Sequence, residues 1–240
     1  TVANSSMLNF ETTPVFSLVV KVQDNGTGNL SSQATVTVSL IDVNETPLIS
    51  NQSFAIAENT ANGSSVGTVV ATDPDAGQTK TFSILSGNTN GALTIHPLTG
   101  MLTVANSAVL NFETTPSFAL IIKVQDNGTG NLSSQATITI SVTDVNEVPI
   151  INNQSFSIAE NSPNGSNVGT VIAVDPDAGQ TKTFSIVSGN TNTAFSINAS
   201  SGMLSVANSS ALNFEVLPSF ALVIKVQDNG AGNLSSQATI

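Results

Sequence analysis

The chain repeats itself at a spacing of 102 residues. The segment QDNGTGNLSSQAT at 23–35 returns unchanged at 125–137 and, with one substitution, at 227–239. The segment DPDAGQTKTFSI at 73–84 returns at 175–186, at the same spacing. Self-similarity at a fixed period indicates that the chain is an array of like units, each of which must bury its own core.

The repeat divides the 240 residues into three parts. Residues 1–45 are predicted to be the C-terminal half of a repeat, residues 46–147 a complete repeat, and residues 148–240 a repeat that lacks its C-terminal end. A unit of 102 residues is long enough for an independent domain. Because the division falls inside repeats, we expect the natural protein to continue in both directions.

Within a repeat, apolar residues fall on every second position, the period of a half-buried strand. Phe118, Leu120, Ile122 and Val124 share one face in this way. Seven strands are predicted per repeat, near 53–57, 67–72, 79–85, 92–96, 101–104, 118–125 and 134–143. Seven short strands in about 100 residues indicate an all-β fold of tandem Greek-key sandwiches of the immunoglobulin type, joined end to end.

Charge and composition exclude several classes of function. Only 5 Lys and Arg oppose 16 Asp and Glu, for a net charge of -11, so the surface repels nucleic acid and anionic membranes and attracts cations. The absence of Cys excludes disulfides and thiolate metal sites. No apolar run reaches 18 residues, so neither a membrane span nor a signal peptide is expected within this fragment.

The acidic residues are confined to five recurring motifs: AEN, DPDAG, NFE, QDNG and DVNE. In a seven-stranded sandwich, DPDAG and QDNG lie at one pole, and AEN, NFE and DVNE lie at the other. Every acidic residue is therefore expected at a junction between consecutive repeats, whereas the five Lys residues lie within strand patterns. Oxygen ligands in a many-membered, flexible group favour Ca²⁺ over Mg²⁺ and over transition metals.

These motifs, in this order, resemble those of cadherin repeats, of the kind found in large bacterial surface proteins. AEN resembles the family's first-strand Glu, LNFE its LDxE element, DPDAG its DxD, QDNG its sixth-strand turn and DVNETP its DxNDNxP linker. The resemblance covers essentially the whole chain. It implies calcium ions at each junction and no enzymatic activity.

The resemblance also implies which residues bind metal. For the first junction, the implied ligands are Glu11, Asn44, Glu45, Asp73, Asp75 and Asp126. For the second junction, they are Glu58, Glu113, Asn146, Glu147, Asp175, Asp177 and Asp228. Asp42 and Asp144 match a linker position that is expected to brace the turn.

Two departures from the family pattern bear on the number of ions. Asn9, Asn111 and Asn213 stand where the family has Asp, which removes a charge from the outermost ion position. The linker is one residue shorter than the family's and has Glu45 or Glu147 where Asp is usual. We expect two to three calcium ions per junction.

Other motifs are better explained as ordinary structure. His96 has no counterpart in the next repeat, where Asn198 stands, so an exposed side chain is favoured over a ligand or base. NGTG lacks the GK[ST] of a phosphate-binding loop and reads as a hairpin turn. The DxD pair resembles a glycosidase acid and base, but its place at a junction with further acids favours metal.

The predicted function is that of a calcium-rigidified rod, the shaft of a large extracellular or cell-surface adhesin or filament. Its partners would be neighbouring repeats and, in a fibre, identical chains. The alternative is an adhesive module that makes homophilic or heterophilic contacts; an enzyme ranks third. Near-identity of exposed turns such as NLSSQAT favours a unit copied for length.

Overall fold

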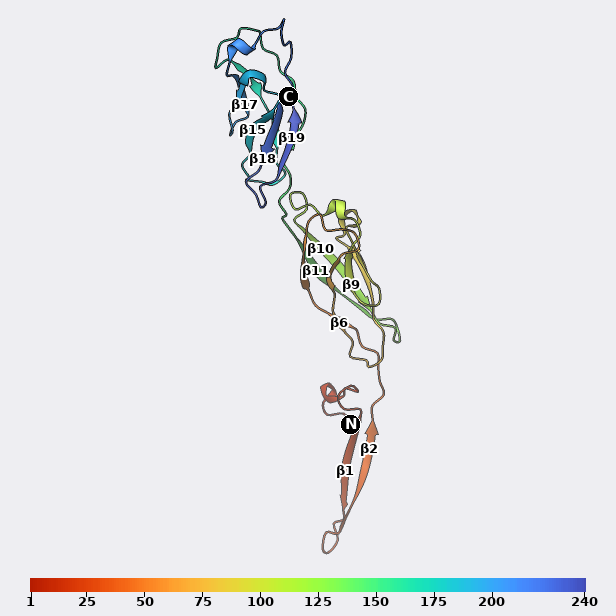
Figure 1. The fold of residues 1–240 in the computed structure, drawn as a ribbon. Helices are drawn as coiled ribbons and strands as arrows, with labels where there is room; N and C mark the ends of the chain where they lie inside the picture. The colour runs from red at the N-terminus through yellow and green to blue at the C-terminus, as the bar shows by residue number, and fades with distance from the viewer. The chain divides into compact units, whose positions relative to one another are not determined.

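The structure is a computed structural model that describes residues Thr1–Ile240 (Figure 1). It contains two compact units, Thr1–Thr143 and Asp144–Ile240, which are described in turn. The regular elements are strands and five short 3-10 helices, and there is no α-helix. This confirms the all-β fold expected from the sequence. No helix is both long enough and apolar enough to cross a membrane.

The first unit contains a two-stranded hairpin and a complete repeat. In the hairpin, β1 (Val15–Gln23) pairs antiparallel with β2 (Ser31–Ser39), after the short helix η1 (Ser5–Met7). The elements of the repeat are β3 (Leu48–Ile49), β4 (Gln52–Ala57), β5 (Ser65–Thr68), β6 (Ala71–Thr72), β7 (Thr81–Ser86), η2 (Thr89–Gly91), β8 (Leu93–Ile95), β9 (Met101–Val104), η3 (Ser107–Val109), β10 (Ser117–Gln125) and β11 (Ser133–Thr143).

Two main sheets enclose the core of this repeat. One has the order β4-β11-β10-β7, with β4 parallel to β11, and the other has the order β5-β9-β8. Leu120, Ile122 and Val124 of β10 and Ile138 and Ile140 of β11 are fully buried between the sheets. These are the alternate positions predicted from the period of two. Burial of each such side chain stabilises the fold by about 1.5–3 kcal/mol.

The hairpin shows what this sequence does without the rest of its sandwich. Val20 and Val22 occupy the positions of Ile122 and Val124, yet they are 50% and 67% exposed. The register of β1 on β2 matches that of β10 on β11. Strand pairing is therefore set locally, whereas burial requires the other strands of a repeat.

In the first unit, one predicted strand is divided in the structure. The strand expected at 67–72 is divided into β5 and β6, because the side-chain amide of Gln52 takes the backbone hydrogen bonds of Val70. Gln52 Oε1 accepts from the Val70 N–H at 3.0 Å, and its Nε2 donates to the Val70 carbonyl at 2.9 Å. β6 then pairs with β3, a two-residue strand that the sequence analysis did not predict.

The second unit repeats this arrangement with one strand fewer. Its elements are β12 (Ile150–Ile151), β13 (Asn167–Thr170), β14 (Ala173–Val174), β15 (Thr183–Ser188), η4 (Thr191–Thr193), β16 (Phe195–Ile197), β17 (Met203–Val206), η5 (Ser209–Ala211), β18 (Val223–Gln227) and β19 (Ser235–Thr239). They form sheets of order β15-β18-β19, β13-β17-β16 and β12-β14.

The first strand predicted for this repeat is absent from the structure. Residues 154–159 are not a strand, because the chain has no residues that correspond to Thr139–Thr143 of β11, the partner of β4 in the first unit. An apolar cavity of about 450 Å³ lies in their place. Its lining includes Phe156, Ile158, Phe195, Leu212, Phe220 and Ile240. In the first unit, Ile140 and Val142 pair with the corresponding Phe54 and Ile56.

Candidate metal centre at the repeat linker

The linker after the hairpin is held against the DPDAG loop of the following repeat. The pairing of β3 with β6 brings the two segments together, since the linker ends at β3 and the loop follows β6. The Glu45 N–H donates to Asp75 Oδ2 at 2.8 Å. The Asp75 N–H in turn donates to Asp73 Oδ1 at 3.1 Å, which is an Asx turn. Local backbone chemistry thus presents these carboxylates to one another.

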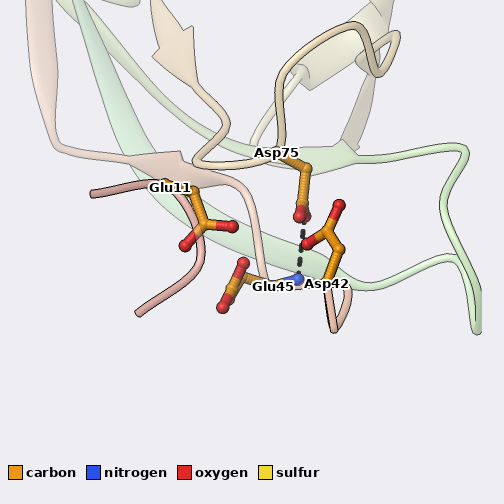
Figure 2. Close-up of side chains that lie close together, drawn as sticks. All are labelled: Glu11, Asp42, Glu45 and Asp75. Atoms are coloured by element: carbon orange, nitrogen blue, oxygen red, sulfur yellow. Dashed lines mark hydrogen bonds between the residues drawn. The ribbon is translucent and has the colours of Figure 1, made fainter. Parts of the chain in front are cut away.

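Four carboxylates meet at this point, those of Glu11, Asp42, Glu45 and Asp75 (Figure 2). One oxygen of each lies within 4.8 Å of the others. They come from three separate segments: the loop before β1, the linker, and the loop after β6. No basic residue is part of the group, so a cation from solution is the natural counter-charge.

Several oxygens here are buried without a hydrogen-bond donor. Asp75 is 4% exposed, and its Oδ1 has no partner. The same holds for Glu45 Oε2 and Asp73 Oδ2. A buried acceptor without a donor is costly. These atoms are all acceptors, and a metal ion is the partner that satisfies acceptors as a group.

The electrostatic environment raises two pKa values. The pKa of Asp42 is raised above its ordinary value of 3.8, first by desolvation and then by the charges of Asp75 and Glu11. The pKa of Glu45 is raised above 4.5 by desolvation, then by Glu11 and Asp75. Each shift means that the ion-free group resists a further negative charge.

Asn44, the linker amide expected to bind metal, is part of a hydrogen-bonded chain. Its Nδ2 donates to Asp126 Oδ2 at 3.2 Å and to the Thr129 carbonyl at 3.0 Å. Its Oδ1 accepts from Gln78 Nε2 at 2.6 Å. Asp126 Oδ1 accepts the Gly128 N–H at 3.1 Å, so this buried carboxylate is held by neutral donors alone. Of the six implied ligands, Asn44 and Asp126 thus form a subset apart from the carboxylate group.

Asn9 serves a local turn. Its Oδ1 accepts from the Thr12 N–H at 2.8 Å and from Thr12 Oγ1 at 2.5 Å. Asn111 makes the same two bonds with Thr114, at 2.8 and 2.5 Å. Asn at positions 9 and 111, where the family has Asp, therefore keeps the hydrogen bonds of the turn and removes one negative charge from the outermost ion position.

The ligands implied for the second junction fall in both units, and each group is described within its own unit. In the first unit, Glu58 Oε2 accepts the Phe112 N–H at 2.9 Å, and Glu113 Oε2 accepts from Asn111 Nδ2 at 3.1 Å. One carboxylate oxygen of Glu58 lies within 4.8 Å of one of Glu113. The first-strand Glu and the LNFE motif thus meet, as the sequence predicts.

In the second unit, the linker and the DPDAG loop repeat the first site bond for bond. The Glu147 N–H donates to Asp177 Oδ2 at 2.8 Å, and the Asp177 N–H donates to Asp175 Oδ1 at 3.2 Å. Asp175 Oδ2 and Asp177 Oδ1 are buried without partners. Desolvation, and then the Asp177 charge, raise the pKa of Asp175, against a lowering by the Asp177 N–H.

The amide chain also recurs there. Asn146 Nδ2 donates to Asp228 Oδ2 at 3.2 Å and to the Ala231 carbonyl at 3.0 Å, while its Oδ1 accepts from Gln180 Nε2 at 2.5 Å. The Gly230 N–H donates to Asp228 Oδ1 at 3.0 Å. The linker amide therefore makes the same hydrogen bonds in both units.

Three residues of these groups were not predicted as ligands from the sequence. Asp42 was assigned to the turn, yet its carboxylate joins Glu11, Glu45 and Asp75. Asp144 likewise has a carboxylate oxygen within 4.8 Å of one of Asp177. Gln78 was not singled out at all, although DPDAGQ is invariant between the two repeats. That identity was the one indication available in the sequence.

His96 is explained without metal. It is exposed, and its Nδ1 accepts the backbone N–H groups of Leu98 and Thr99 at 3.3 and 3.2 Å. Asn198 Oδ1 accepts from Ser200 and Ser201 in the same way. Imidazole and amide are interchangeable as caps of this turn.

Comparison with known proteins identifies the fold family. The sequence profile of the Cadherin domain matches residues 52–143 and 154–240. The chain belongs to the cadherin family. It is 34% identical over 240 residues to human Protocadherin Fat 1 and 35% identical over 211 residues to human Cadherin-23. These alignments cover 95% and 83% of this cadherin chain, but only 5% and 6% of the length of those proteins.

Solved cadherin structures agree with the fold. Protocadherin Gamma B7 extracellular cadherin domains 1-4 superpose with a TM-score of 0.73 at 27% identity, over 98% of this chain and 58% of that one. Mouse Cadherin-23 EC22-24 gives a TM-score of 0.68 at 26% identity, over 97% of this chain and 75% of that one. The relatives named here are animal proteins, so the likeness to bacterial surface repeats stays a prediction. Cadherin domains bind calcium at repeat junctions, and the acid groups described above fit that chemistry.

Proposed function

We propose that this chain is a calcium-stiffened shaft region of a large extracellular surface protein, of the bacterial adhesin or filament type. The observation that carries the proposal is the group formed by Glu11, Asp42, Glu45 and Asp75, in which a buried Asp75 oxygen has no donor. Oxygen-only ligands in a flexible loop setting suit Ca²⁺ better than the small octahedral Mg²⁺.

The position of these residues along the chain argues for a structural role. Glu11 belongs to the half-repeat, Asp42 and Glu45 to the linker, and Asp75 to the next repeat. An ion bound by all four carboxylates would link the half-repeat, the linker and the next repeat in addition to the backbone and the hydrogen bonds of the linker. The same residue types recur 102 positions later as Glu113, Asp144, Glu147 and Asp177, so we propose the same role for these four residues. We propose Glu58 and Asp175 as further ligands of that junction.

Two ions per junction are favoured over three. The outermost position would use Asn9 or Asn111, and in both cases the amide oxygen already serves a local turn. The carboxylate group forms one position. The half-buried Asp73 and the buried Asp126, with the linker amide, offer the second.

Near-identity of neighbouring repeats supports a shaft built by copying. The exposed turn NGTGNLSSQAT is shared by the hairpin and the first complete repeat, where a recognition surface would be expected to vary. Extracellular placement is supported by the likeness of this chain to the Protocadherin GammaB4 extracellular domain.

Isothermal titration of the 240-residue protein tests the ion. Calcium is expected to bind with dissociation constants of about 10⁻⁴–10⁻³ M and magnesium far more weakly. Asp75→Asn should lower calcium affinity and stoichiometry. Asp24→Asn is the control for the loss of one charge, because Asp24 lies in the QDNG turn of the hairpin and is not part of the carboxylate group.

Equal responses to calcium and magnesium, or equal losses in the two variants, would show that the acids act only as a diffuse negative surface. Stiffening is tested by small-angle scattering of the same protein. The distribution of maximum dimensions should be narrow with calcium and broader after chelation.

A further inference from the structure

Gln78 lies behind the linker amide and is not part of the carboxylate group. Its Nε2 donates to Asn44 Oδ1 at 2.6 Å, and its own Oε1 is buried with no partner. Gly128 borders the pair so closely that a Cβ there would lie 1.9 Å from Asn44 Oδ1 and 2.5 Å from Gln78 Oε1. The two amides are therefore enclosed, and each is fixed by the other.

The second unit contains an independent copy. Gln180 Nε2 donates to Asn146 Oδ1 at 2.5 Å, and Gln180 Oε1 is again buried without a partner. A Cβ on Gly230 would lie 1.7 Å from Asn146 Oδ1. A buried, unpartnered amide oxygen that appears twice at the same place points to a function for that oxygen.

The linker amide stands where a cation would compete with it. In the ion-free arrangement, the NH₂ group of Asn44 lies between Asp126 Oδ2 and the Thr129 carbonyl and donates to both. A cation bound between those two oxygens replaces the NH₂ group as their partner. Asn44 can add a ligand only if its oxygen, now bonded to Gln78, turns toward the ion.

We propose that Gln78 and Gln180 are positioning residues that set which end of the linker amide faces the buried aspartate. In the ion-free protein, Gln78 donates to the Asn44 oxygen and holds the NH₂ group against Asp126. When a cation binds beside Asp126, both amides turn, and the Gln78 oxygen accepts from the Asn44 NH₂ group. This inference rests on the proposed function, because it assigns a role at the second ion position.

The chemistry of glutamine suits this role and that of its analogues does not. An amide can donate or accept along the same direction after a half-turn. A carboxylate can only accept, so it favours the ion-bound orientation of Asn44. The thioether of Met has a similar length, but it cannot donate a hydrogen bond and accepts only weakly, so Met would leave the orientation of the Asn44 amide unfixed.

The test uses ¹⁵N-labelled 240-residue protein and three substitutions at Gln78 or close to it. In chelator, the Asn44 side-chain NH₂ protons of the wild type should be protected from solvent exchange, and Gln78→Met should abolish that protection. Calcium should shift the Asn44 and Gln78 side-chain signals together. By titration, Gln78→Met should change calcium affinity little, because the variant loses one hydrogen bond to Asn44 in the ion-free state and one in the ion-bound state.

Gln78→Glu should bind calcium more tightly than the wild type, and also more tightly than Ala76→Glu, which adds the same charge to an exposed position of the same loop. Gln135→Met on the exposed face of β11 controls for the substitution itself. Gln180→Met provides the same measurement in the second unit if the Gln78 variant folds poorly.

The outcomes separate the two proposals. If the wild type binds calcium but Gln78→Met matches it in proton exchange, or Gln78→Glu binds calcium no more tightly than Ala76→Glu, Gln78 has no positioning role and the inference is overturned. If the wild type binds no calcium at all, the proposed function is wrong, and the positioning role of Gln78 is wrong with it.

Discussion

Replacement of Gly128 by Ala tests whether the linker amide chain holds the first unit together. Gly128 is the glycine of the QDNG turn, and its backbone φ is not in the left-handed region, so Ala is acceptable to the backbone. The added Cβ would lie 1.9 Å from Asn44 Oδ1, 2.5 Å from Asn44 Cγ and 2.5 Å from Gln78 Oε1. The atoms in its way belong to side chains, so the amides must move rather than the strands.

The size of the effect follows from the bonds that moving Asn44 would break. Three hydrogen bonds are lost, from Asn44 to Asp126, from Asn44 to the Thr129 carbonyl and from Gln78 to Asn44. Each contributes about 0.5–1.5 kcal/mol net, and Asp126 is left as a buried charge with one donor fewer. We expect Gly128→Ala to lower the free energy of unfolding of the first unit by about 2–4 kcal/mol.

Gly26→Ala is the matched control. It makes the same change in the same motif, but the nearest atom to its Cβ is Asp24 Oδ1 at 3.6 Å, an ordinary contact. Differential scanning calorimetry in chelator should resolve a loss of about 8–20 °C in the transition of the first unit for Gly128→Ala. The melting temperature of Gly26→Ala should stay close to that of the wild type. Equal melting temperatures for the two variants would refute the enclosed amide pair.

Three further outcomes are expected. In chelator, the melting temperature of the first unit should rise as the pH falls from 7 toward the raised pKa values of Asp42 and Glu45. The raised pKa values give stability that is present below 3.8 and 4.5 and is lost as the pH rises through the raised values, and saturating calcium should reverse the trend. Ile122→Ala should destabilise the first unit by about 2–5 kcal/mol, and the equivalent Val20→Ala by much less, as measured by urea denaturation. A peptide TISVTD should fill the cavity of the second unit and raise its melting temperature, whereas the same peptide with Asp at its Ile and Val positions should have no effect.

The fold was predictable because its determinants are local and periodic. Alternation in FALIIKVQ fixes which side chains of β10 face the core, and the 102-residue repeat fixes how often this occurs. The break between β5 and β6 was not predictable, since it depends on Gln52, whose amide is distant in sequence from Val70. A long-range side-chain bond leaves no periodicity for a sequence argument to detect.

The site was predicted at the level of motifs but not of roles. The gathering of Glu11, Glu45 and Asp75 followed from strand order alone, and the structure shows it. Strand order also placed Asp42 at the junction, but it does not determine where a side chain points, and the resemblance assigned this residue to the turn. The roles as metal ligands stay a prediction for every residue of the set, and the division into repeats at 45/46 and 147/148 also stays one.

Neutral amides in the site bear on how the joint behaves without its ion. Asn9 stands where the family has a carboxylate, and Asn44, held by Gln78, supplies the buried Asp126 with neutral donors. Each amide satisfies its neighbours through hydrogen bonds that need no cation. Repulsion in the ion-free state is then concentrated on the group of Glu11, Asp42, Glu45 and Asp75, while the amide side remains bonded. Loss of calcium should therefore loosen the carboxylate group first and leave the contact of the linker with the Asp126 loop in place, so that the repeat stays folded while its joint becomes mobile.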